Sequence, residues 1–132
     1  MLKLLFSFLL IAFAYFASAE EAYFRFINES PTFAIKLTNS TLIQHARELI
    51  SGNTTENPHI QGRIVKAEVH WNYPWSFMVE PDSISFFNAT EDAVCDMGIR
   101  WINRHLDQVC DTLLPGCHWC PWSSKFIEEI KL

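Results

Sequence analysis

The chain has 132 residues, a formal net charge of −5 and hydrophobic residues at 49% of its positions. This size predicts one folded domain around one core. The acidic balance argues against a nucleic-acid-binding protein, which needs a basic surface to neutralise phosphates, so nucleic acid is not a predicted partner.

The N-terminal residues have the pattern of a secretory signal peptide. Lys3 gives a positive start, residues 4–16 form an apolar run broken by one serine, and Ala17-Ser18-Ala19 supplies the small residues that signal peptidase requires. The run is shorter than the roughly 20 residues that cross a bilayer, and no later segment is long enough. The sequence therefore predicts removal of residues 1–19, secretion of residues 20–132 as a single extracellular domain, and no transmembrane segment.

Four Asn-x-Ser/Thr sequons follow, which in a secreted eukaryotic chain are acceptors for N-linked glycans. Asn53 is the strongest candidate because it lies in the polar stretch 51–58. The same asparagines can act as turn or cap residues, and Asn39 and Asn88 both precede helical patterns. The predicted acceptors are Asn28, Asn39, Asn53 and Asn88.

Alternation of apolar and polar residues predicts strands along most of the domain. The first two are expected to form a hairpin around Ser30-Pro31. The C-terminal segment fits either a last strand or a helical turn, and strand is favoured. The predicted strands are residues 22–27, 32–37, 61–71, 76–79, 84–87 and 125–132.

Two segments have helical periodicity. Residues 42–50 are preceded by a capping-box pattern at Thr41 and followed by a stop at Gly52. The clearer helix runs from about Glu91 to Leu113 and ends at Pro115-Gly116. The predicted fold class is α+β, a small antiparallel sheet with two helices packed on it. The buried face of the second helix is predicted to contain Cys95, Ile99, Ile102, Leu106, Val109 and Leu113, widened by Val94, Met97 and Trp101.

Four cysteines in a small secreted domain predict a disulfide-stapled fold. In a continuous helix Cys95 and Cys110 would lie about 22 Å apart, far beyond the Cα separation of about 5.5–6 Å that a disulfide needs. Two pairings remain, Cys95–Cys117 with Cys110–Cys120 and Cys95–Cys120 with Cys110–Cys117. Both require an extended Cys117–Cys120 segment, a helix that breaks before Cys110, or one bridge only. The second pairing is favoured because it ties the tail to the helix and closes the Pro-Gly turn.

The segment Cys117-His118-Trp119-Cys120 also has the C-x-x-C spacing of thiol–disulfide oxidoreductases. A redox C-x-x-C is best placed at the start of a helix that follows a strand, whereas this one follows a predicted helix and a turn. A structural role is therefore favoured over redox activity at Cys117 and Cys120. Zinc binding by these two residues with His118 lacks a second spaced pair of ligands, so no metal or cofactor is predicted.

Four of the five tryptophans lie in two proline-bearing stretches, 70–77 and 118–122. Proline keeps such stretches out of regular strand pairing, so their rings can face solvent. Exposed Trp and Tyr suit sugar stacking or a protein interface, whereas the same rings can instead fill the space where two loops meet. The predicted ligand-binding residues are Trp71, Tyr73, Trp75, His118, Trp119 and Trp122.

No catalytic set is recognisable, because the chain lacks G-x-S-x-G, H-E-x-x-H and a glycine-rich phosphate loop. The sequence therefore favours a secreted binding domain over an enzyme, with a protein or a glycan as partner. The alternatives are a thiol–disulfide activity at Cys117 and Cys120, and a secreted effector or inhibitor of a foreign protein.

Short motifs spread over the domain resemble one family, the amino-terminal domain of a slime-mould calmodulin-binding protein, which is also found as small secreted single-domain proteins. The resemblance implies no catalytic residues. It does imply cysteines at positions matching Cys95 and Cys120, in keeping with a bridge between them. The most specific motifs are Asn72-x-Pro74-Trp75-Ser76-Phe77 and Cys120-Pro121-Trp122-Ser123-Ser124, with Gly62-Arg63-Ile64-Val65-Lys66 and Pro81-Asp82-x-Ile84-x-Phe86-Phe87 in support.

The resemblance raises calmodulin as a partner, and the sequence disfavours it. A calmodulin target helix is usually basic and amphipathic. The predicted helix carries Arg100 and Arg104 against a larger number of acidic residues. A secreted protein would also not meet cytosolic calmodulin, so calmodulin is not a predicted partner. The acidic residues are Glu91, Asp92, Asp96, Asp107 and Asp111.

Overall fold

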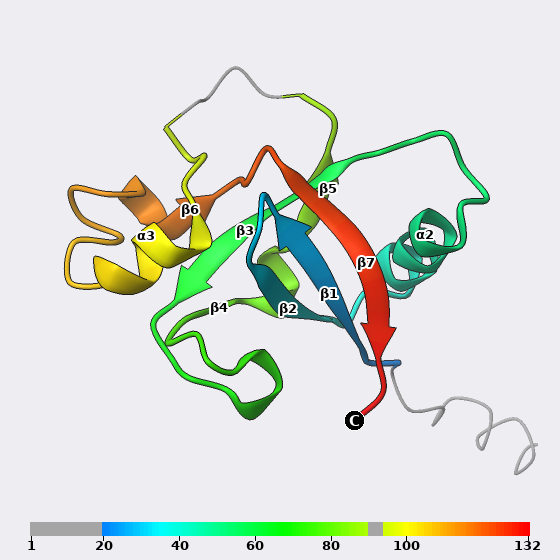
Figure 1. Ribbon diagram of the computed structural model, residues 1–132, viewed down its shortest axis with the longest axis horizontal. Coiled ribbons are helices and arrows are strands. Elements are labelled where there is room, and N and C mark those ends of the chain that lie inside the picture. Colours follow the sequence, from blue (N-terminus) through cyan, green and yellow to red (C-terminus); the bar gives the residue numbers. More distant parts are fainter. Residues whose placement is uncertain (1–19, 90–93) are drawn as a thin grey trace, which may run out of the picture.

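The computed structural model describes residues 20–89 and 94–132, which form two antiparallel sheets around one hydrophobic core (Figure 1). The first sheet has the strand order β2-β1-β7, so the N-terminal hairpin lies beside the C-terminal strand. The predicted hairpin is confirmed, and the last segment is a strand. The three strands are β1 (Ala22–Asn28), β2 (Thr32–Leu37) and β7 (Ser124–Ile130).

Strand β7 forms one edge of this sheet and contains a bulge. Phe126 pairs with Phe26 of β1, whereas Glu128 pairs with the preceding residue of β1, Arg25. Ile127 is therefore an extra residue in β7, and 42% of it is exposed.

Strand β3 (His59–Val65) is the centre of the second sheet and pairs with three short strands at different points along its length. Gly62 of β3 lies opposite Trp119. A Cβ atom at Gly62 would lie 2.5 Å from Val79 Cγ1, so glycine is needed where these strands approach each other. The short strands are β4 (Met78–Val79), β5 (Ser85–Phe87) and β6 (His118–Trp119).

The predicted strand 61–71 is wrong beyond Val65. The chain turns there, and residues 70–72 form a single helical turn, η2 (His70–Asn72), in which the backbone N–H of Asn72 donates to Val69 O at 3.1 Å. A second such turn, η3 (Pro81–Ser83), connects β4 to β5. The alternation in residues 66–71 therefore does not mark strand pairing.

Helix α2 (Ser40–Ser51) packs against β7 and β2 (Figure 1). Asn39 caps it in place of the predicted capping box: Asn39 Oδ1 accepts from the backbone N–H of Thr41 and of the following residue. Gly52 ends the helix at φ 76°, a left-handed conformation that glycine adopts without strain, so the predicted stop is confirmed.

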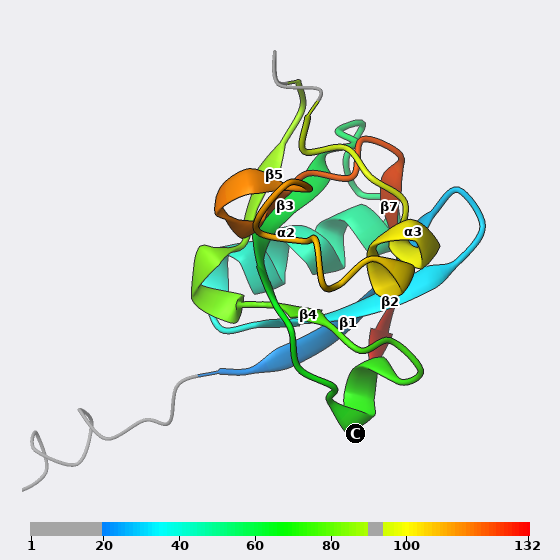
Figure 2. The same ribbon diagram turned by 90° about the vertical axis from the view of Figure 1, so that its left-hand side faces the viewer.

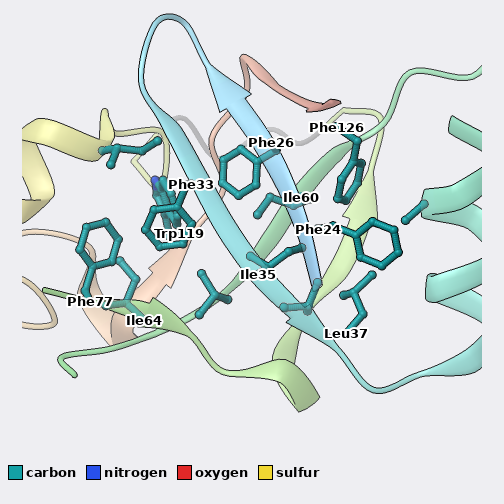
Figure 3. Packing of buried hydrophobic residues seen from close by; sticks show 14 of the residues in the cluster. Phe24, Phe26, Phe33, Ile35, Leu37, Ile60, Ile64, Phe77, Trp119 and Phe126 are labelled. Carbon is teal, nitrogen blue, oxygen red and sulfur yellow. The ribbon is translucent and has the colours of Figure 1, made fainter. Parts of the chain in front are cut away.

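An aromatic cluster joins the two sheets (Figure 3). The fully buried ring of Trp119 lies 5.2 Å from Phe33, 5.7 Å from Phe77 and 6.0 Å from Phe26, measured between ring centroids. Tilted and edge-to-face contacts of this kind are the favourable arrangements of aromatic pairs. Trp119 therefore ties β6 to the core beneath the first sheet.

The predicted helix from Glu91 to Leu113 is wrong. Residues 91–93 lie outside the described residues, and the helix that forms, α3 (Ile99–Arg104), has only six residues. The chain then folds into turns, and η4 (Pro115–Cys117) precedes β6. The predicted apolar face is partly correct, because Ile99, Ile102 and Val109 are fully buried. Among the described residues, no helix is long and apolar enough to cross a bilayer.

The two disulfides explain why the helix stops. Cys95 bonds to Cys120, with Cα atoms 5.1 Å apart, and Cys110 bonds to Cys117, with Cα atoms 4.3 Å apart. Cys110 and Cys117 both have positive φ, as does Leu114 between them, and none of these conformations fits a helix. The favoured pairing and the α+β, disulfide-stapled fold are confirmed, through a helix that breaks before Cys110.

Candidate ligand-binding surface

The two predicted aromatic stretches do not share one surface. The Trp71 ring lies 5.4 Å from that of Tyr23, near the start of β1. The Trp122 ring lies 5.5 Å from that of Phe87, close to the other end of β1, where Asn28 pairs with Ser124. These two ends of β1 are about 17 Å apart at the usual rise per residue. The stretches must therefore be considered separately.

In the second stretch, Trp119 is fully buried, so its predicted contact with a ligand is wrong. Its indole Nε1 donates to Met97 O at 2.8 Å, which satisfies the polar atom inside the core. Trp122 is half-buried against Phe87 and His59. His118 is the exposed member of this stretch, so little aromatic surface remains here for a ligand.

The first stretch, residues 70–77, is here named the Tyr73 loop, and a buried amide holds its base. Asn72 is 2% exposed, its Oδ1 accepts from Ala34 N at 2.7 Å, and its Nδ2 donates to Phe77 O at 3.0 Å. Both ends of the loop are thereby fixed to each other and to β2. An unpaired amide buried in this way would be costly, so Asn72 is a positioning residue.

Two further hydrogen bonds fix the middle of the Tyr73 loop. Trp75 Nε1 donates to Thr32 O at 2.7 Å, and the backbone N–H of Ser76 donates to Asn103 Oδ1 at 2.8 Å. The second bond holds the loop beside α3, and both ribbon views show these segments side by side (Figures 1 and 2). Between these anchors Tyr73 is 76% exposed. The loop therefore presents Tyr73 and uses its other aromatic residues for support.

Helix α3 presents an aromatic residue that the sequence interpretation placed in the core. Trp101 is 53% exposed, and its ring stacks on His105 with centroids 4.1 Å apart and planes 24° apart. The long predicted helix hid this residue. A six-residue helix that buries Ile99 and Ile102 must turn Trp101 outward, because the two buried residues occupy the opposite side.

The outward side of α3 is also basic in an acidic chain. The three other arginines are ion-paired, Arg25 with Glu128, Arg47 with Glu20 and Glu129, and Arg63 with Glu80. Within residues 20–89 and 94–132, no carboxylate lies within ion-pair distance of Arg100 or Arg104, and both are exposed. We name this surface the α3 face. It comprises Tyr73, Arg100, Trp101, Arg104 and His105.

A second group of reactive side chains surrounds the Cys95–Cys120 disulfide. The sulfur atoms and a ring nitrogen of His118 lie within 4.8 Å of one another, a separation that would suit a metal ion. Both sulfur atoms are already bonded to each other and cannot serve as thiolate ligands. Because Cys117 and Cys120 belong to different disulfides, the C-x-x-C does not form the redox pair considered from the sequence.

Neither of two hollows in the surface suits a small molecule. One of about 220 Å³ is lined by Val94, Cys95, Pro115 and His118. Another of about 560 Å³ runs along α2 and is lined by polar side chains. Small-molecule pockets are mostly apolar with a few polar groups, and neither hollow has that character at a sufficient size. The residues that line the second are Ser40, Thr41, Gln44, His45, Glu48 and Glu56.

The sequon asparagines lie in different surroundings. Asn28 is 5% exposed within β1, and this burial disfavours a glycan on its side chain. Asn39, Asn53 and Asn88 are exposed, and the cap at Asn39 uses the oxygen atom, which leaves Nδ2 available. Glycosylation at these three sites stays a prediction.

The family model for the N-terminal domain of the calmodulin-binding protein matches residues 20–132. The chain belongs to this family. The resemblance drawn from the motifs is thus confirmed, and within this family domain the motif residues Asn72, Trp75 and Phe77 are those that anchor the Tyr73 loop. No curated protein and no solved structure shows a significant match to the chain.

Proposed function

We propose that this chain is a secreted, disulfide-stabilised domain that binds a protein or a glycan through the α3 face. The observation that carries the proposal is the contrast between Tyr73 and Trp101, which are 76% and 53% exposed, and the anchored or buried rings around them. Exposed aromatic side chains on a rigid support contribute much contact area at little cost in conformational entropy.

The supporting structure is rigid for reasons visible in its contacts. Ser76 and Asn103 connect the Tyr73 loop to α3, and Asn72 fixes the base of the loop in the core. Preorganised side chains lose less freedom on binding, so more of the contact energy appears as affinity. This arrangement supports binding rather than catalysis, since no nucleophile with an adjacent base is part of the α3 face.

Secretion is the second element of the proposal. It rests on the signal-peptide pattern in residues 1–19 and on the use of all four cysteines in disulfides, which persist in oxidising compartments. The family match begins at residue 20, the residue that follows the proposed cleavage point. N-terminal sequencing of the protein from the culture medium of expressing cells tests this element, and retention of residues 1–19 would contradict it.

The binding element is tested with a printed array of neutral and acidic polysaccharides and of extracellular matrix proteins. The secreted protein is compared with Tyr73→Ala/Trp101→Ala and with a matched control, Val65→Ala/Ile127→Ala, which removes exposed apolar side chains from other surfaces. The expected result is retention of the wild-type and control proteins on at least one ligand, and loss of the first variant with its thermal unfolding unchanged. Equal loss in both variants, or no retention anywhere, would overturn the proposal.

A further inference from the structure

We propose that the α3 face recognises an acidic polysaccharide, with Trp101 stacking on a sugar ring and Arg100 and Arg104 binding its carboxylate or sulfate groups. This inference rests on the proposed function and specifies the chemistry of the ligand. The charge on the α3 face and the geometry of its aromatic pair carry it.

The positive charge of the α3 face is available to a ligand. Every arginine outside α3 is neutralised by a carboxylate, whereas Arg100 and Arg104 have none within ion-pair distance in residues 20–89 and 94–132. Asp107, the exposed acid that follows α3, is not paired with either of them in that part of the chain. A guanidinium group binds carboxylate or sulfate oxygens through paired, charge-assisted hydrogen bonds, so these two side chains favour an anion.

Spacing places the two arginines beside the indole. Residues four apart on a helix are neighbours, with Cβ atoms about 5–6 Å apart, and Trp101 lies three residues before Arg104 on the same surface. One charged sugar unit can therefore contact a guanidinium while the adjacent ring lies on Trp101. Several such contacts along a polymer give useful affinity even where each contact is weak.

The imidazole of His105 fixes the orientation of Trp101. His105 Nδ1 lies 2.8 Å from Trp101 O, and because a carbonyl oxygen can only accept, Nδ1 carries the hydrogen. The stacked imidazole covers one face of the indole, and the 53% exposure of Trp101 leaves the other face open to solvent. A flat aromatic surface of this kind suits the apolar face of a sugar ring.

The surroundings of Trp101 favour a saccharide over a protein partner. Protein hot spots are aromatic side chains surrounded by other apolar contacts that exclude water. The exposed positions of α3 that flank Trp101 are instead Arg100 and Arg104, which stay hydrated. A polyhydroxylated, charged polymer can bind such a surface without an apolar rim, whereas an acidic peptide would use the arginines alone.

The test uses the secreted protein and four immobilised probes: dextran sulfate, polygalacturonate, neutral dextran and poly-L-glutamate. We expect binding to both acidic polysaccharides, weakening as salt is raised, and none to neutral dextran. Arg100→Gln/Arg104→Gln should lower this affinity at least about tenfold. Trp101→Ala should lower it about fivefold to tenfold and leave binding to poly-L-glutamate unchanged.

The matched control is Arg25→Gln/Arg63→Gln, which removes the same charge from arginines that are already ion-paired. We expect it to bind like the wild type. An equal loss in this control would show a net-charge effect, and poly-L-glutamate binding as tight as that of the polysaccharides would indicate an acidic peptide; either overturns the inference. Binding to none of the four probes also overturns it, whereas the proposed function fails only if the wider array is empty as well.

Discussion

The first sheet with α2 and the segment of residues 94–119 are stabilised in different ways. The sheet has regular alternation, with Phe24 and Phe26 fully buried, and an ion pair between Arg47 and Glu129 joins α2 to β7. The segment has one short helix, parts of two disulfides and three non-glycine residues at positive φ. Periodic burial specifies the first region, and covalent cross-links specify the second.

The largest effect is expected where the two regions meet, at Trp119. Trp119→Ala removes the ring that packs on Phe26 and Phe33, and should lower the free energy of unfolding by about 3–5 kcal/mol. The half-exposed Trp101 is the matched control, and Trp101→Ala should change stability by about 0.5 kcal/mol or less. Urea unfolding measures both, and similar losses in the two variants would contradict the assignment of their environments.

The disulfides should stabilise the segment locally. Loop-closure entropy predicts about 3.5 kcal/mol for Cys95–Cys120 and about 2.5 kcal/mol for Cys110–Cys117, whose sequence separations are 25 and 7. In the variant Cys110→Ser/Cys117→Ser, amide hydrogen exchange should accelerate in residues 105–117 while β1 stays protected. Uniform acceleration throughout the domain would show that the segment is not a separate unit of stability.

The smallest effect concerns the ion pair of the sheet region. Hydrogen bonds from Arg47 and from Lys131 hold the pKa of Glu129 at about 2, below its usual 4.5. The lowered pKa stabilises the fold above pH 4.5, and this contribution is lost as the pH falls from 4.5 toward 2. Glu129→Gln should therefore cost about 1 kcal/mol at neutral pH, since the pair is partly solvated, and nothing near pH 2.

A comparison of unfolding free energy across this pH range tests the Glu129 prediction. Glu68→Gln serves as the control because it removes the same charge from an exposed residue outside the ion pairs found among the described residues. We expect its stability to follow that of the wild type. A Glu129→Gln effect that persists at low pH would mean that the side chain acts through packing rather than charge.

The contrast between the two regions also explains what the sequence could predict. Periodicity identified the hairpin and α2 because each buries one regular face, and Gly52 marked the end of α2. The helix 91–113 was predicted from real burial of Ile99, Ile102 and Val109, but periodicity does not report that a cross-link reverses the chain. The disulfide pairing was recovered only because one allowed route required a break before Cys110.

The candidate surface was harder to predict than the fold. The motif of the Tyr73 loop was visible, yet Trp75 and Asn72 use their polar atoms internally and only Tyr73 is presented. Trp101 was assigned to the core because the helix was taken to be longer than it is. Its neighbours Arg100 and Arg104 were the available signal, since two arginines beside a tryptophan rarely face a core.

The bulge in β7 has a consequence for how these molecules behave toward one another. An edge strand with regular geometry offers a row of backbone groups on which a strand of a second molecule can pair. The extra residue Ile127 interrupts that row, and Lys125 and Glu128 place charges on either side of it. The irregularity thus protects the open edge of a three-stranded sheet from aggregation at high concentration.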